Sequence, residues 1–127
     1  MAVYGPISTG LSTGGAGAST ANVDSGQIVR GFLVGVYLQY NGSPPAATTD
    51  VTIKTKGATG VLPSYNLLVM TNAATDGFFA TQIETRKSTD GTASGQYAYP
   101  YIEDIVNVTI AQANDGDSVT VWLYTVN

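Results

Sequence analysis

A chain of 127 residues, with 43% hydrophobic and only 11% charged residues, has the composition of one folded domain with an uncharged surface. It contains no Cys and no His, which excludes disulfide frameworks, zinc sites built on sulfur or imidazole, and His-dependent catalytic triads. The net charge is −4 and the five basic residues form no cluster, which argues against nucleic-acid binding.

Residues 1–27 are predicted to form an extended N-terminal arm. The segment from residue 5 to residue 27 is rich in Gly, Ser, Thr and Ala, which offer little apolar burial against the entropy of ordering the backbone. Its few large apolar side chains are spaced along it like anchors for another surface. These candidate interface residues are Val3, Tyr4, Ile7 and Leu11. An ordinary disordered terminus is the alternative interpretation.

Short β-rich runs separated by turn residues follow from residue 28 onward. Strands are predicted over residues 28–40, 50–56, 66–71 and 78–85, on alternating or continuous apolar patterns. The run 66–71 (NLLVMT) has the pattern of a core strand. Residues 86–96 (RKSTDGTASGQ) are polar and Gly-rich, and are expected to form a long exposed loop.

Three tyrosines then recur at a spacing of two. In an extended segment Tyr97, Tyr99 and Tyr101 share one face, and Pro100 confines the segment to an edge or to the start of a strand. Tyrosines in that arrangement suit a protein interface and also stacking on sugars. Half-buried packing at the edge of a sandwich is the alternative.

The last 23 residues are predicted to form a hairpin. Residues 105–112 and 118–126 alternate cleanly around the turn sequence 114–117 (NDGD). Val119, Val121 and Leu123 are expected to face the core. Trp122 and Tyr124 lie on the other face of this strand. They are assigned to the core, on the view that the strand is covered on both sides, and an exposed patch is the alternative.

No segment has sustained helical periodicity, so the fold class is all-β. Six or seven strands at intervals of roughly ten residues predict an antiparallel sandwich or barrel with Greek-key links over residues 28–127. The longest apolar stretch, near residues 31–38, is far shorter than the ~20 residues that span a bilayer, so no membrane contact is expected. The first ten residues show no signal peptide, so synthesis in a cytoplasm is expected.

Two acidic groupings are candidate sites. Residues 114–117 offer oxygen ligands for calcium, but Asn, Asp and Gly are also the residues that a tight turn requires. Glu84, Glu103 and Asp104 are candidates for the paired carboxylates of a glycoside hydrolase, although nothing in the sequence shows that one of them is buried or tuned. We therefore expect no enzymatic activity, no cofactor and no metal site.

From residue 28 onward the chain resembles the decoration, or cement, proteins of tailed-bacteriophage capsids. The resemblance rests on residues 34–40 (VGVYLQY), 49–53 (TDVTI), 67–71 (LLVMT), 75–78 (TDGF) and 115–121 (DGDSVTV). It implies a jelly-roll-like β-sandwich of about seven or eight strands that assembles as a homotrimer on the outer capsid surface and stabilises the shell.

The same resemblance implies the partner and the contacts. The partner would be the major capsid protein, the N-terminal segment would be the reaching arm, and the tyrosine strand and residues 86–96 would be further contact elements. The acidity of the chain agrees with a place outside the shell, away from packaged DNA. The alternative is a carbohydrate- or receptor-binding β-sandwich of a phage fibre or tail.

Overall fold

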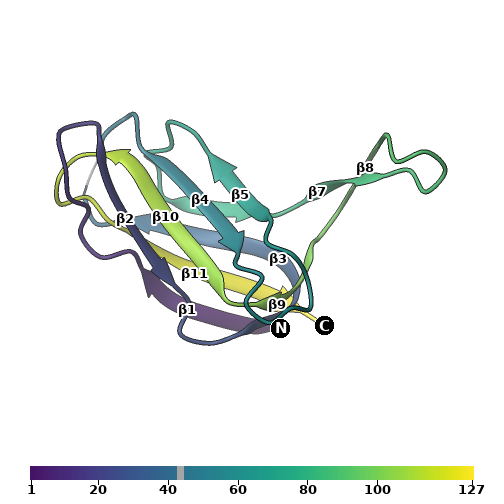
Figure 1. The fold of residues 1–127 in the computed structure, drawn as a ribbon. Coiled ribbons are helices and arrows are strands. Elements are labelled where there is room, and N and C mark those ends of the chain that lie inside the picture. The colour runs from purple at the N-terminus through teal and green to yellow at the C-terminus, as the bar shows by residue number, and fades with distance from the viewer. Residues whose placement is uncertain (43–44) are drawn as a thin grey trace.

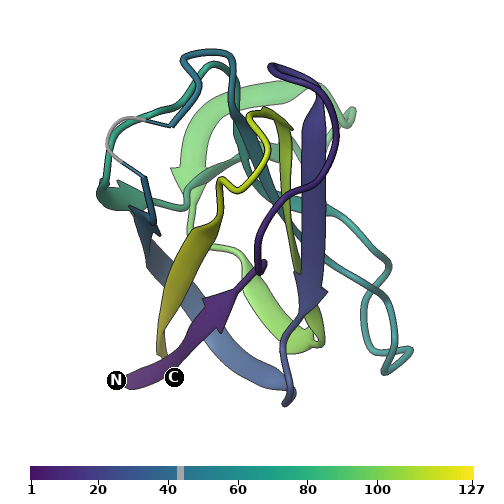
Figure 2. The same ribbon diagram turned by 90° about the vertical axis from the view of Figure 1, so that its left-hand side faces the viewer.

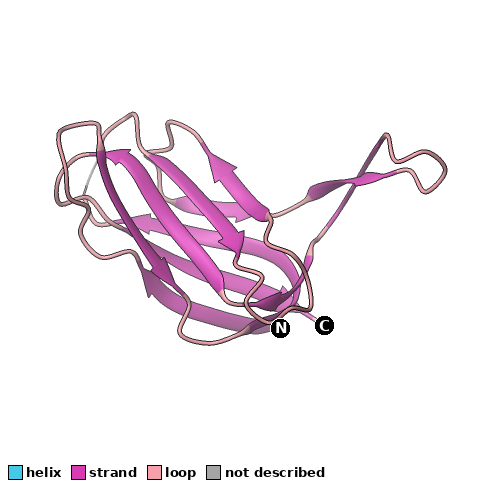
Figure 3. Ribbon diagram, in the orientation of Figure 1, coloured by secondary structure: helices cyan, strands magenta, loops and turns pink. Residues whose placement is uncertain are grey.

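The computed structural model describes residues 1–42 and 45–127, which form strands and loops without a helix (Figure 3). No helix in this part of the chain is long and apolar enough to cross a membrane. The strands are β1 (Ala2–Ser8), β2 (Ser19–Asp24), β3 (Val29–Tyr40), β4 (Asp50–Thr55), β5 (Asn66–Met70), β6 (Gly77–Ala80), β7 (Ile83–Arg86), β8 (Ala93–Ala98), β9 (Tyr101–Asp104), β10 (Val106–Ala113) and β11 (Val119–Val126). The all-β class is confirmed, with more and shorter strands than predicted.

Two antiparallel sheets pack against each other as a sandwich (Figures 1 and 2). The first sheet has the strand order β1-β11-β3-β6, and β9 also pairs with β3. The second sheet has the order β2-β10-β4-β5. The remaining two strands, β7 and β8, pair with each other as a separate ribbon.

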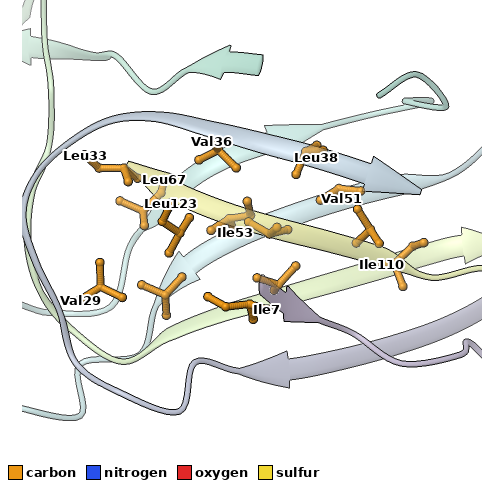
Figure 4. Packing of buried hydrophobic residues seen from close by; sticks show 14 of the residues in the cluster. Ile7, Val29, Leu33, Val36, Leu38, Val51, Ile53, Leu67, Ile110 and Leu123 are labelled. Atoms are coloured by element: carbon orange, nitrogen blue, oxygen red, sulfur yellow. The ribbon is translucent and has the colours of Figure 1, made fainter. Parts of the chain in front are cut away.

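The core lies between the two sheets and is filled by alternate side chains (Figure 4). On β11, Val119, Val121 and Leu123 are all 0% exposed, as the alternation predicts. Ile53 and Ile110 fill the same layer from the second sheet. Each such side chain stabilises the fold by about 1.5–3 kcal/mol relative to an exposed position. The alternating pattern therefore fixes which face of each sheet is inward.

The predicted C-terminal hairpin is wrong. β10 pairs with β2 and β4 in the second sheet, whereas β11 pairs with β1 and β3 in the first. The turn at residues 114–117 therefore carries the chain from one sheet to the other. A turn sequence between two alternating strands does not distinguish a hairpin from a crossover between sheets. In either case each of the two strands buries one face in the same core.

The expectation of a separate arm over residues 1–27 is corrected. This segment is extended, but β1 lies along β11 and β2 lies along β10, so it supplies one edge strand to each sheet. Between them, the Ser12 N–H donates to the carbonyl of Asp117 at 2.8 Å, and the Thr9 N–H donates to that of Val119 at 3.0 Å. Backbone hydrogen bonds hold this Gly-rich segment, and composition does not reveal them.

Strand β3 organises the edge of the first sheet from which β7 and β8 emerge. β11 occupies one edge of β3, and the other edge pairs with β9 over Val29–Phe32 and with β6 over Gly35–Leu38. Leu33 lies in the gap between these two pairings. Its N–H donates to the carbonyl of Pro100 at 2.9 Å, and its carbonyl accepts the hydroxyl hydrogen of Thr81 at 2.6 Å. The chain leaves and rejoins the sheet at this point.

Residues 78–85 were expected to form one strand, and the structure divides them. β6 ends at Ala80, where the buried Thr81 turns the chain away from β3, and β7 begins at Ile83. The predicted loop over residues 86–96 contains the end of β7 and much of β8. Neither face of this ribbon is buried in the core, so its sequence is polar and Gly-rich and shows no strand pattern.

Candidate functional site

A hairpin over residues 81–100 projects from the sandwich, and we call it the projecting hairpin (Figure 1). It consists of β7, β8 and the turn between them. Nearly all of its side chains are exposed, including Tyr97 at 61% and Ile83 at 37%. A two-stranded ribbon without a hydrophobic core is marginally stable by itself in water. The projecting hairpin is therefore a candidate contact element.

Its own polar groups hold the projecting hairpin in one conformation. The hydroxyls of Thr85 and Ser94 lie 2.7 Å apart across the strands, and the Gly95 N–H donates to Glu84 Oε2 at 3.0 Å. At the tip, the N–H and the hydroxyl of Thr92 both donate to Asp90 Oδ1, which lowers the pKa of that carboxyl. These bonds reduce the entropy that the hairpin would lose on docking.

The second candidate surface is the outward side of the first sheet, which we call the aromatic face. Because Val121 and Leu123 point into the core, Trp122 and Tyr124 between and beside them must point outward. The prediction that these two rings belong to the core is wrong: both are half-buried, and within residues 1–42 and 45–127 no second layer covers the outer side of β11. The aromatic face consists of Phe32, Tyr37, Phe78, Tyr101, Trp122 and Tyr124.

The rings of the aromatic face contact one another in three pairs. The centroids of Tyr37 and Trp122 are 5.9 Å apart, those of Phe78 and Tyr124 are 5.4 Å apart, and those of Phe32 and Tyr101 are 5.4 Å apart. All three pairs are edge-on or tilted, the arrangement that the ring quadrupoles favour. Phe78 is 58% exposed and Phe32 is 44% exposed. The face thus presents a connected apolar surface to solvent.

Charge is scarce on the aromatic face. At the end nearest β9, Arg30 Nε donates to Glu103 Oε1 at 2.9 Å, so these two charges neutralise each other. The other polar neighbours on the outward positions of β3 and β11 are Gln39 and Thr120. Such a surface favours contact with another uncharged surface over electrostatic steering.

The structure separates the N-terminal interface candidates. Val3 and Leu11 are exposed at 54% and 67%, and Val3 lies beside Tyr124 at the margin of the aromatic face. Tyr4 packs against the core, and Ile7 is a core residue at 9% exposure, so Ile7 is corrected to a structural role. An apolar residue in a Gly-rich segment can contact a partner or pack into the core of its own chain. The sequence does not distinguish the two, because the direction of the side chain depends on how β1 pairs with β11.

The three tyrosines are all exposed, but they do not form one row. Tyr97 lies on β8 in the projecting hairpin, Tyr101 begins β9 on the aromatic face, and Tyr99 lies between these strands. The break occurs at the buried Pro100, as the proline predicts. Tyr97 and Tyr101 therefore belong to the two candidate surfaces separately.

The three candidate carboxylates of a hydrolase have structural partners. Asp104 is 1% exposed and accepts N–H hydrogen bonds from Gly57, from Ala58 at 2.9 Å and from Ile105 at 2.7 Å. Glu103 pairs with Arg30, and Glu84 stabilises the projecting hairpin as described above. Each carboxylate is committed to holding backbone or a cation, and none has a geometry that indicates acid–base chemistry.

The acidic turn likewise uses its oxygens internally. Asp117 Oδ2 accepts the N–H groups of Asn114 at 2.9 Å and of Ala46 at 3.2 Å. Within residues 1–42 and 45–127, no group of three or more acidic side chains is placed to hold a metal ion. Three surface hollows lie beside Pro6, Lys87 and Asp76, and none of them is lined by a pair of carboxylates.

Further titratable groups are perturbed within the fold, among them Asp24 and Tyr40. The Lys56 ammonium, 2.7 Å from Asp24 Oδ2, and the amide of Asn107 lower the pKa of the Asp24 carboxyl. Burial, reinforced by the charge of Asp76, raises the pKa of Tyr40 to about 12. Both groups lie outside the projecting hairpin and the aromatic face, so these shifts bear on stability rather than on binding.

No protein-family profile matches this chain, and no curated protein is similar to it in sequence. Among solved structures, it is similar to a mutant of a family 29 carbohydrate-binding module that was studied for ligand recognition. The two chains share 9% identity with a TM-score of 0.46, over 96% of this chain and 81% of the other. A likeness at this level carries no argument about function.

Proposed function

We propose that this protein is a structural component of a bacteriophage particle. It binds the major capsid protein on the outer surface of the shell and stabilises the shell as a homo-oligomeric decoration protein. The observation that carries the proposal is the projecting hairpin, an ordered ribbon that has no partner within the described chain. The family resemblance noted from the sequence supports the same role.

The physics of a lattice suits such a protein. A small domain with few charged side chains makes only modest contacts at one site, but a shell repeats that site many times. Neighbouring copies that touch both the shell and each other then gain effective concentration at every contact, without new chemistry. Stabilisation of the shell would follow from binding alone.

The test uses shells assembled from the major capsid protein with and without this chain. Binding is measured by co-sedimentation, and shell stability by the temperature at which packaged DNA is released. We expect saturable binding and a higher release temperature. If the intact chain does not sediment with any shell of its own phage, or binds without changing the release temperature, the proposal is wrong.

The aromatic face favours a second candidate function, the binding of a glycan. The exposed ring of Phe78 and the half-buried ring of Trp122 offer apolar surfaces on which the C–H faces of sugars stack, and Gln39 and Thr120 offer hydrogen bonds beside them. A glycan array tests this candidate. Binding that Phe78→Ala and Trp122→Ala abolish, while Tyr97→Ala leaves it intact, would support it.

A further inference from the structure

We propose that the projecting hairpin of one copy lies across the aromatic face of a second copy, so that this contact joins the chains of a closed homo-oligomer. The inference deepens the proposed function and rests on it for the biological setting, since a decoration protein that binds as an oligomer needs a contact between its own copies. Its occupant is a second copy of this chain.

The projecting hairpin cannot cover the aromatic face of its own chain. Its root is fixed at Leu33 by the hydrogen bonds to Thr81 and Pro100, and the ribbon points away from the sandwich (Figure 1). In this conformation one chain therefore presents two surfaces that have no partner among its described residues, and these surfaces meet only between copies.

The chemistry of the two surfaces matches. The projecting hairpin exposes Tyr97 and Tyr99, and the aromatic face exposes Phe78 and Phe32. Tyrosine is a favourable interface residue, because it gives a large apolar contact with a polar tip and loses little rotamer entropy. Burial of these rings against each other would remove most of the exposed aromatic surface of the chain from water.

Charge also favours a contact between copies through these surfaces. The hairpin carries two acids and two bases, so its net charge is zero, and the remaining residues of the chain carry the whole net charge of −4. The aromatic face carries only the neutralised Arg30–Glu103 pair. A contact between hairpin and face therefore brings no excess of like charge together.

The area of the contact indicates that the oligomer is closed. From its root to its tip the hairpin is about 25 Å long and about 12 Å wide, at the usual rise and spacing of β-strands. One hairpin on one face then buries about 600 Å² in total, below the ~1,200 Å² at which stable interfaces begin. A two-fold exchange of hairpins places two such contacts in a single interface and reaches about 1,200 Å², so the area favours a closed two-fold pair.

The absence of cysteine from the sequence allows a cross-linking test without background. A chain with Tyr97→Cys is mixed with a chain with Phe78→Cys under mild oxidation. We expect a disulfide-linked pair that joins the two different variants. The matched control replaces the second variant by Val69→Cys, which is equally exposed at 58% but lies on β5 of the other sheet. Equal cross-linking of the control would overturn the inference.

Light scattering on the purified chain gives an independent readout. We expect a closed oligomer, and a double variant with Tyr97→Ser and Tyr99→Ser should weaken self-association by at least about tenfold. Both side chains are exposed, so the double variant should keep the unfolding free energy of the wild type. A wild-type chain that stays monomeric at the cross-linking concentration would overturn the inference.

The outcomes separate this inference from the proposed function. A monomeric chain that still binds shells overturns only the contact between copies. A closed oligomer that binds to no shell overturns only the capsid role. If Tyr97→Cys instead cross-links to the capsid protein on particles and never to Phe78→Cys, the hairpin belongs to the shell contact and the inference is wrong.

Discussion

Replacing Gly35 by alanine should disable the aromatic face while leaving the sandwich folded. Phe78 covers Gly35 from the neighbouring strand β6, and a Cβ at position 35 would lie 2.1 Å from Phe78 Cζ and 2.6 Å from Phe78 Cε1. That overlap forces the ring to leave its place. Because the clash involves the end of an exposed side chain rather than backbone, the ring can rotate away.

The expected cost of Gly35→Ala is small. Phe78 would lose its pairing with Tyr124, about 0.5–1.5 kcal/mol. It would also lose less than half of the ~1.5–3 kcal/mol of a fully buried ring, since 58% of it is already exposed. Against this, alanine restricts the unfolded chain by about 0.4–1 kcal/mol, because Gly35 has no positive φ. The net loss is about 1 kcal/mol, from a typical total of about 5–15 kcal/mol.

Gly31→Ala on the same strand is the matched control. Gly31 has a φ of +119°, and a Cβ there would lie 2.8 Å from the carbonyl oxygen of Val126, which belongs to β11. Backbone strain of about 1–3 kcal/mol adds to an overlap that no side-chain rotation relieves. We therefore expect Gly31→Ala to lower the unfolding free energy by at least about 3 kcal/mol.

Urea unfolding followed by the fluorescence of Trp122, the single tryptophan, measures both variants. Light scattering then compares their oligomeric states with that of the wild type. Gly35→Ala should unfold at nearly the wild-type urea concentration and yet lose self-association. Equal destabilisation by both substitutions would refute the steric reasoning. Full stability together with full self-association would refute the assignment of Phe78 to a contact.

Three further predictions concern the stability of the fold. Asp104→Asn should lower the unfolding free energy by about 2–3 kcal/mol in urea titrations, because an amide cannot accept all three backbone N–H groups that the carboxylate accepts. The pKa of Asp24 is lowered from 3.8 in the folded state, so its stabilisation is present above that pH and lost as pH falls through it; Asp24→Asn should flatten the fall in unfolding free energy between about pH 5 and pH 3. The pKa of Tyr40 is raised from 10.0 to about 12, so its contribution is complete below pH 10 and lost as pH rises toward 12; Tyr40→Phe should remove that alkaline loss when unfolding is compared at pH 8 and pH 11.

The alternating segments were predictable because burial on one side leaves a period of two in the sequence. Residues 28–40, 50–56 and 118–126 were placed as strands within one residue of their observed ends. Inward positions such as Leu38, Ile53 and Val121 followed from the same pattern. These features depend only on the local chain and on one core, and both leave a record in the sequence.

The pairing of strands left no such record. Edge strands β1 and β2 are held by backbone hydrogen bonds, which any side chain except proline permits, so a Gly-rich segment looked like a free arm. The projecting hairpin has no buried face, so its strands have no apolar period to detect. In both cases the sequence lacks the apolar signal on which the predictions relied.

The sequence showed part of the aromatic face, but the assignment of two of its rings to the core was wrong. Trp122 and Tyr124 were placed on the face opposite Val121 and Leu123, which is correct. The error was to cover that face with a second layer, since large aromatic residues are usually buried. In the structure both rings are half-buried on the outward side of the first sheet.

Strand β3 ties the two candidate surfaces together. Leu33 fixes the root of the projecting hairpin, and Gly35, two residues along the same strand, lies beneath Phe78 on the aromatic face. The root of the hairpin and the ring that it would meet on another copy are therefore anchored on one short stretch of the same sheet. In a contact between copies, the oligomer closes when the rotation that brings one hairpin onto the second chain's aromatic face also brings the second hairpin onto the first.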